Sequence, residues 1–145
     1  MKTDWRNTKI IQRLANWTEE DGTGIALGSQ AGYTLPNGAV RAPDASWIPL
    51  HRWNALSTEE QEKFANIYPD FAVELMSPSN TLEELQAKMN EYIANGVRLG
   101  WLIDPYEKRV YVYRPNHPVQ CLDDPATITG DPVLPGFTFS PSEIW

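Results

Sequence analysis

The chain has 145 residues, 41% of them hydrophobic, with six Trp and six Tyr, which predicts one folded domain over residues 1–145 and excludes a disordered chain. Its formal net charge of −7 counts against tight non-specific binding of nucleic acid, because proteins that grip nucleic acid usually present a basic face. A single Cys121 excludes an internal disulfide and a Cys-rich zinc site, and neither a membrane-length apolar run nor a signal-peptide pattern is present, so we expect a cytoplasmic protein.

Periodicity and turn signals along the chain predict alternating helices and strands. The expected elements, in chain order, are a helix at 7–17, strand pieces within 24–35, a returning strand at 39–48, a loop at 49–56, a short helix at 57–65, a strand between Pro69 and Pro78, a helix at 81–95, strands at 97–103 and 109–113, and short strands beyond. Pro36-Asn37-Gly38 is a strong hairpin signal before the returning strand. This order predicts an α/β domain with a mixed sheet.

The strand between the two prolines carries a carboxylate in an apolar setting. Phe71, Val73 and Leu75 alternate along it and form a large apolar face, which we expect to be core. The opposite face begins at Asp70 and holds Glu74 between apolar neighbours. A buried carboxylate without a partner is costly, so Glu74 needs a metal, a cation or a cleft.

Asp44 is a second acid with apolar neighbours. If residues 39–48 form one strand, Asp44 shares a face with Ser46 and Ile48. The alternative is that Asp44 lies in a turn directly after Pro43.

Lys88 lies on the helix that follows the Glu74 strand. We expect Ser79-Asn80 to cap this helix, with Glu83 three residues after Asn80, and Gly96 to end it. The helix carries one apolar stripe, made of Leu82, Leu85, Met89, Tyr92 and Ile93. Lys88 falls about 100° from the centre of this stripe, from where it could fold back toward the preceding strand. The alternative pairs Lys88 with Glu84 at i, i+4 on a solvated face, which is worth only about 0.2–0.5 kcal/mol.

These acids and the lysine suggest a metal site. Asp70 and Glu74 are roughly 13 Å apart along one strand, so they cannot share an ion. Asp44 is the best partner for Glu74, because adjacent strands lie about 4.8 Å apart and both carboxylates could then reach one Mg²⁺. Such an ion activates water and stabilises charge on a phosphodiester, and Lys88 could orient the water or neutralise the transition state.

Several sequence runs, in this order, resemble the Uma2 family. They are Arg41 to Ile48 (RAPDASWI), Pro69 to Ser79 (PDFAVELMSPS), then Lys88, Tyr92 and Gly96, and Trp101 to Pro105 (WLIDP). Members of this family are abundant in cyanobacteria and are described as putative restriction endonucleases. The similarity covers most of the chain and implies the fold of the PD-(D/E)XK nuclease superfamily, a restriction-endonuclease-like mixed sheet flanked by helices.

The resemblance also implies roles for individual residues. Asp44 and Glu74 match the two metal acids of the family. Lys88 matches a catalytic lysine displaced onto the following helix, because Met76 stands two residues after Glu74. Asp70 is a possible accessory residue. The implied cofactor is Mg²⁺ or Mn²⁺, and the implied substrate is DNA.

The chain departs from the family in one respect. It lacks the helix and acid-bearing hairpin that usually precede the helix at residues 7–17. We expect this loss to leave apolar surface lined by Trp5, Trp17 and Tyr33, which a homodimer would cover.

Two classes of function therefore stay open. One is a Mg²⁺-dependent endonuclease, a phosphodiester hydrolase, which the set of Asp44, Glu74 and Lys88 favours. The other is a non-catalytic interaction or dimerisation protein that keeps the nuclease fold, which the acidic charge and the departure from the family favour.

Overall fold

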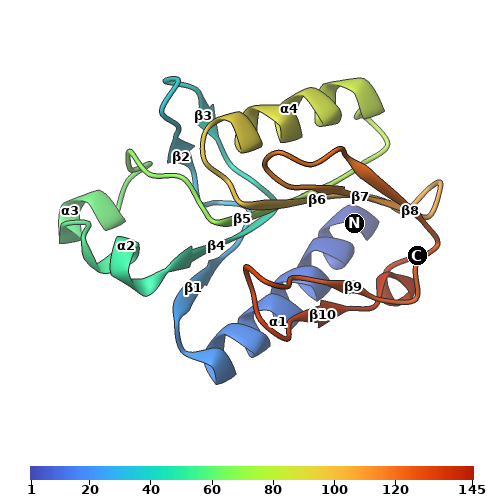
Figure 1. The fold of residues 1–145 in the computed structure, drawn as a ribbon, viewed down its shortest axis with the longest axis horizontal. Helices are drawn as coiled ribbons and strands as arrows, with labels where there is room; N and C mark the ends of the chain where they lie inside the picture. Colours follow the sequence, from blue (N-terminus) through green and yellow to red (C-terminus); the bar gives the residue numbers. More distant parts are fainter.

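A six-stranded mixed sheet lies at the centre of the fold, in a computed structural model that describes residues 1–145 (Figure 1). The strand order is β1-β4-β5-β6-β7-β8, with β5 and β6 parallel and the other neighbours antiparallel. The strands are β1 (Gly24–Leu27), β4 (Ala45–Pro49), β5 (Phe71–Leu75), β6 (Leu99–Asp104), β7 (Arg109–Tyr113) and β8 (Gln120–Asp123). The predicted mixed sheet is therefore confirmed.

Helices cover both faces of this sheet. Helix α1 (Lys2–Asp21) packs on β1 and β4, and α4 (Leu82–Ala94) packs on β5, β6 and β7 from the other side (Figure 1). The smaller elements are α2 (Leu50–Asn54), α3 (Thr58–Gln61), the 3₁₀ turn η1 (Pro141–Glu143), and two ribbons, β2 (Tyr33–Thr34) with β3 (Val40–Arg41) and β9 (Ile128–Thr129) with β10 (Thr138–Phe139). The β9–β10 ribbon shares the α1 side of the sheet.

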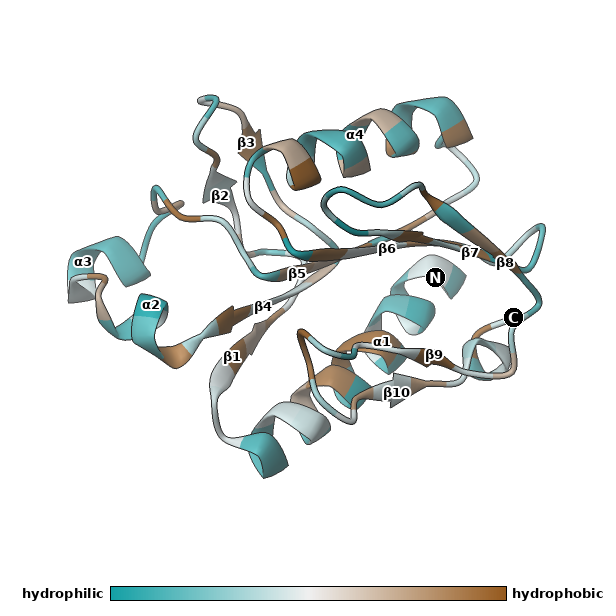
Figure 2. Cartoon of the chain, in the orientation of Figure 1, coloured by the Kyte–Doolittle hydropathy of each residue, from teal (hydrophilic) through white to brown (hydrophobic).

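Both faces of β5 are buried, which explains why Glu74 lies in an apolar setting. Phe71, Val73 and Leu75 pack with α1 in one core cluster, as the alternation predicts. Ala72, on the opposite face, packs with Met89 of α4 in a second cluster. Hydrophobic colour is concentrated along the central strands, whereas α3 is hydrophilic (Figure 2). Glu74 belongs to the face that α4 covers.

The start of α4 differs by one residue from the expected cap. Thr81 is the N-cap and forms a reciprocal capping box with Glu84, instead of Asn80 with Glu83. The Glu84 Oε1 atom accepts from the backbone N–H of Thr81 at 2.7 Å. This bond satisfies one of the free N–H groups at the helix start and directs Glu84 back toward it. The helix ends at Ala94 with Asn95 as its C-cap, and Gly96 follows the cap at φ +111°, as predicted.

The stretch at 39–48 is two strands and not one. The hairpin predicted at Pro36-Asn37-Gly38 is present, but β3 pairs only with β2 in a separate ribbon. The chain then bends through residues 42–44 before β4 joins the main sheet. Pro43 accounts for the break, because proline cannot donate to a ladder. The loop expected at 49–56 contains helix α2.

The expected apolar surface is only partly present. Tyr33 is 2% exposed, and its hydroxyl is 2.6 Å from the Ser46 hydroxyl, so the expectation for Tyr33 is wrong. Trp17 is half-buried and packs edge-on against Trp47 at 6.0 Å between ring centres. Trp5 is 47% exposed.

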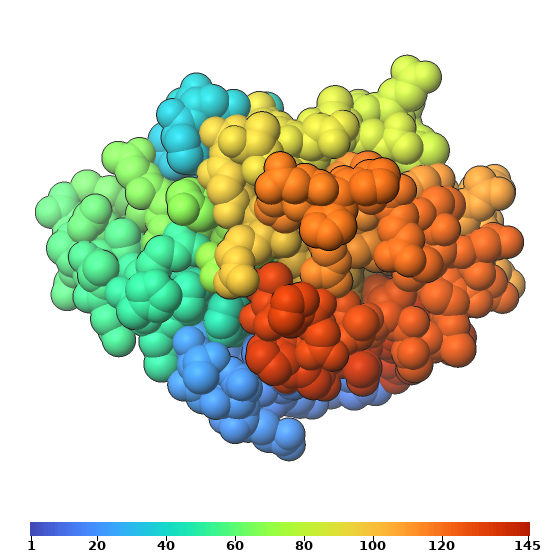
Figure 3. Space-filling model, in the orientation of Figure 1, coloured from blue at the N-terminus to red at the C-terminus, as the bar shows by residue number.

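The two ends of the chain pack together. The buried Arg6 donates from Nε to the backbone oxygen of Ile144 at 2.8 Å, and Arg13 pairs with Glu143 at 2.6 Å. In the space-filling view the C-terminal residues form a broad patch next to part of α1 (Figure 3). No helix of the structure combines the length and the apolar character needed to cross a membrane.

Candidate functional site

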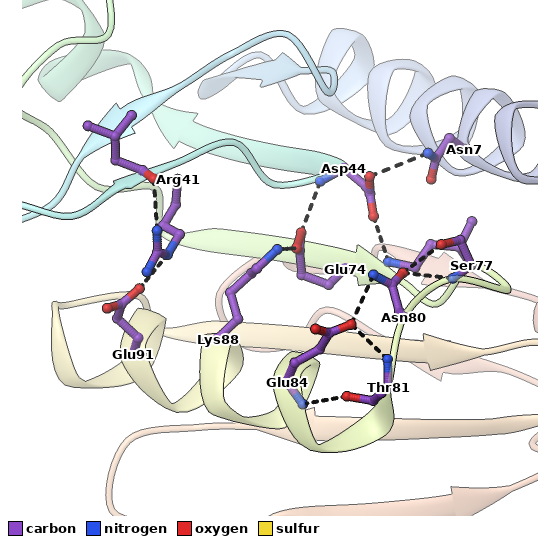
Figure 4. Close-up of polar contacts among 12 residues, drawn as sticks. Asn7, Arg41, Asp44, Glu74, Ser77, Asn80, Thr81, Glu84, Lys88 and Glu91 are labelled. Carbon is purple, nitrogen blue, oxygen red and sulfur yellow. Dashed lines mark hydrogen bonds and ion pairs between the residues drawn. The ribbon is translucent and has the colours of Figure 1, made fainter.

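Glu74 lies in the middle of the candidate site, near the C-terminal end of β5. It is 3% exposed and faces α4. The Lys88 ammonium donates to its Oε1 at 2.8 Å, and the backbone N–H of Asp44 donates to its Oε2 at 3.2 Å (Figure 4). The cation that a buried carboxylate requires is therefore supplied by α4.

Asp44 lies directly beside Glu74, although it is not inside a strand. Ala45 pairs with Val73, so the residue before β4 falls opposite Glu74. Asp44 occupies a bend after Pro43, which is the alternative that the sequence left open. Its Oδ2 accepts from the backbone N–H of Leu75 at 2.7 Å, which extends the ladder by a side chain (Figure 4).

The two acids perturb each other. Burial, and then the charge of Asp44, raise the pKa of Glu74 to about 7, while the hydrogen bond from Lys88 opposes the rise. Burial also raises the pKa of Asp44, against the N–H of Leu75, the charge of Lys88 and a hydrogen bond from Asn7. Two adjacent carboxylates with raised pKa values favour a cation between them.

Lys88 points to the acids and not to its own helix. The pair with Glu84 that the sequence allowed is absent, because the Glu84 Oε1 is held at the helix start. The Lys88 side chain is 35% exposed, whereas the Glu74 side chain is 4% exposed. Lys88 therefore extends from the buried carboxylate to the solvent.

Asp70 lies apart from this group, at the other end of β5. It forms an ion pair with Arg52 of α2, and the Arg98 guanidinium is 3.6 Å away. Arg52 also donates to the backbone oxygen of Tyr68 at 2.6 Å. These contacts link α2 to the start of β5, and the charge of Asp70 is neutralised there by two arginines.

Two further residues adjoin the acids. Asn7 of α1 donates from Nδ2 to the Asp44 Oδ1 at 3.4 Å, and its own Oδ1 is buried with no hydrogen-bond partner. The hydroxyl of Tyr92, a residue with 0% exposure one turn after Lys88, also has no partner. Burial raises the pKa of Tyr92 well above its usual range, and the charges of Glu74 and Asp44 add to this.

Sequence reasoning gave neither Asn7 nor Tyr92 a role at this site. The position of Tyr92, four residues after Lys88, could have indicated that it shares the face of α4 toward the acids. No comparable spacing links Asn7 to Asp44, which is 37 residues away. A buried polar atom without a partner costs about 1–3 kcal/mol, and the chain itself supplies no partner for either atom.

The donor set fits a divalent cation in part. Carboxylate and amide oxygens are the ligands that Mg²⁺ and similar hard cations prefer. Nowhere in the chain do three His, Cys, Asp or Glu side chains gather in a way that could hold a metal ion. Asp44 and Glu74 are thus two adjacent acids without a third, and the unpartnered Asn7 oxygen lies next to Asp44.

Comparison with solved structures shows that another protein shares this fold. A putative nuclease belonging to DUF820 from Anabaena variabilis has a similar structure, with a TM-score of 0.82 over 99% of this chain and 80% of that chain, at 22% sequence identity. At this identity the likeness concerns the fold.

A family model described as "Putative restriction endonuclease" matches residues 2–142, and the chain belongs to this family, Uma2. The resemblance and the fold expected from the sequence are therefore confirmed. Restriction-endonuclease-like families generally use divalent metal ions. No curated protein is similar enough in sequence to count as a match.

Proposed function

We propose that this protein is a metal-dependent endonuclease that hydrolyses phosphodiester bonds in DNA, with Mg²⁺ or Mn²⁺ as its cofactor. The proposal treats residues 1–145 as one nuclease-like domain. A single free and exposed Cys121 suits the reducing cytoplasm, which we include as the location.

One observation carries the proposal. Asp44, Glu74 and Lys88 come from the bend before β4, from β5 and from α4, and they meet in one hydrogen-bonded group. This grouping of two acids with a lysine provides ligands for a cation and a positive charge for a phosphate. Family membership makes nucleic acid the substrate class to test.

Each residue has a separate task in this mechanism. Asp44 and Glu74 would hold the metal, which when bound would polarise the scissile phosphate and lower the pKa of water. Lys88, exposed on one side, positions the attacking water or offsets the negative charge that grows on the phosphate. The Leu75 N–H fixes the Asp44 carboxylate, which reduces the reorganisation needed for binding. Asp70 is a possible accessory residue that acts through the position of β5.

The decisive assay compares the wild type with an Asp44→Ala/Glu74→Ala double variant that is purified identically. Plasmid, linear DNA, single-stranded DNA and RNA are incubated with each protein and Mn²⁺. We expect slow nicking by the wild type, and a Lys88→Ala variant should lose about 10²-fold or more of the rate. Equal cleavage by the wild type and the double variant would identify a contaminating nuclease, and the non-catalytic interaction protein would then be the better explanation.

The proposal also includes that the protein assembles as a homodimer. Trp5 is 47% exposed on α1, and Tyr106 is 48% exposed beside Arg6 of the same helix. Exposed aromatic side chains of this size are common at interfaces between subunits.

A further inference from the structure

The acids of the candidate site leave a cation short of protein ligands. Asp44 and Glu74 are the only carboxylates near the proposed cation, because Asp70 is paired with Arg52 at the other end of β5. Mg²⁺ takes six oxygen ligands in a near-octahedral shell and usually keeps several waters. A neutral oxygen from a third element would fix the ion more firmly than two carboxylates on neighbouring strands.

Asn7 supplies such an oxygen from α1. Its Nδ2 is 3.4 Å from the Asp44 Oδ1, which is longer than a normal N–H···O hydrogen bond of about 2.7–3.2 Å. Its Oδ1 is buried and has no donor. Figure 4 shows the amide facing Asp44 across the gap between α1 and the bend before β4. A weak bond on one side and an unpartnered oxygen on the other are a poor arrangement for a purely structural amide.

A half-turn of the Asn7 amide exchanges its oxygen and nitrogen. The carbonyl oxygen then takes the place of Nδ2, 3.4 Å from the Asp44 Oδ1. Neighbouring ligand oxygens of an octahedral Mg²⁺ at about 2.1 Å lie about 3 Å apart, so this spacing is close to that of two ligands of one ion. Two such oxygens repel each other unless a cation lies between them, so the flipped amide suits a site that holds an ion.

We propose that Asn7 is a third oxygen ligand of the divalent cation held by Asp44 and Glu74. The inference rests on the proposed metal site but concerns a different element of the fold. Helix α1 then contributes to the site directly, and cation binding ties α1 to the bend before β4.

Mn²⁺ titration followed by electron paramagnetic resonance tests this without any nuclease activity. Asn7→Ala removes the ligand and should weaken Mn²⁺ binding about 10-fold or more. Asn7→Asp replaces the amide oxygen by a charged one, so it should bind Mn²⁺ at least as tightly as the wild type. Thr8→Ala is the matched control, because Thr8 is exposed on the same helix and its hydroxyl donates to the Asp4 carbonyl.

The outcomes separate a ligand from a positioning residue. If Asn7 only orients Asp44 through its N–H, both variants lose that donor and should weaken binding equally, which would overturn the proposal. Unchanged binding in both variants, together with a loss in Asp44→Asn, would overturn it and leave the proposed function intact. A wild type that binds no Mn²⁺ would overturn the metal site and the role of Asn7 together. Circular dichroism establishes that each variant is folded.

Discussion

Replacing Glu74 by Gln is expected to stabilise the metal-free protein at neutral and alkaline pH. Glu74 is 3% exposed, and both burial and the charge of Asp44 disfavour its ionised form. Gln keeps the shape of the side chain and can still accept from the N–H of Asp44, but it carries no charge. The substitution therefore removes an unfavourable charge from the fold while it preserves the packing against α4.

The size and sign of the effect follow from the pKa. A rise from 4.5 in the unfolded chain to about 7 in the folded protein means that the folded state holds the Glu74 proton more tightly. This contribution to stability is fully present below pH 4.5 and is lost as pH rises through about 7. At about 1.4 kcal/mol per pH unit, ionised Glu74 costs the fold about 3 kcal/mol above pH 7.

The substitution does not recover this full amount. Glu74→Gln leaves Lys88 without an ionic partner, although the 35% exposure of the Lys88 side chain allows water to replace it. We therefore expect a net gain of about 2 kcal/mol at pH 8. For a chain of this length about 2 kcal/mol corresponds to a rise in melting temperature of about 4–8 °C.

Urea unfolding with a chelator present measures the effect between pH 5 and pH 8.5. The stability of Glu74→Gln relative to the wild type should increase with pH across this window and level off above pH 7. A constant difference, or a variant that is less stable than the wild type at pH 8, would refute the reasoning. With Mn²⁺ present the wild type should be more stable than Glu74→Gln, because only the wild type retains both acids and gains stability from the ion.

The remaining predictions concern Asp70 and assembly. Arg52→Leu leaves the 8%-exposed Asp70 with only the more distant Arg98, so we expect a loss of about 2–4 kcal/mol in unfolding experiments with unchanged Mn²⁺ affinity. Arg109→Leu breaks an exposed pair with Asp123 and is the control, with an expected change in unfolding free energy of about 0.5 kcal/mol or less. Altered Mn²⁺ affinity in Arg52→Leu would contradict this prediction and connect Asp70 to the metal. Sedimentation at tens of micromolar should show a dimer that Trp5→Ser weakens, and a monomeric wild type would exclude the homodimer.

The central strand could be predicted from the sequence because two independent signals coincide there. Pro69 and Pro78 bound the stretch, and the alternation of Phe71, Val73 and Leu75 defines its core face. The apolar neighbours of Glu74 indicated that the other face is buried as well, but not which element covers it. That burial comes from α4, whose contact with β5 depends on the tertiary fold and not on local pattern.

The partner of Lys88 could not be settled by spacing alone. Glu84 at i−4 and Glu74 on the preceding strand were both within reach. The choice follows from a shift of one residue in the helix cap, since Thr81 with Glu84 fits a capping box as well as Asn80 with Glu83 does. Once Glu84 bonds to the Thr81 N–H, Lys88 is left to neutralise the buried Glu74.

The position of Asp44 shows the same limit. The sequence offered a strand or a turn, and the bend after Pro43 is correct, yet its carboxylate still reaches the Leu75 N–H. Either local structure would have placed Asp44 near Glu74, because β4 pairs with β5 in a register that brings them opposite. The prediction that Asp44 lies beside Glu74 therefore holds even though the single strand expected at 39–48 is wrong.

The protein has a net charge of −7, and the basic side chains near Asp44 and Glu74 are themselves already paired with acids. Lys88 is held by Glu74, and Arg41 pairs with Glu91 at 2.6 Å. A phosphate that approaches the site therefore meets cations that already have partners, so its binding should be weak and should weaken further with salt. Lys88 becomes available to a phosphate only when another cation satisfies Glu74. On this reasoning substrate affinity should depend on the divalent ion through Lys88 as well as through the ion itself, and Lys88→Ala should reduce that dependence.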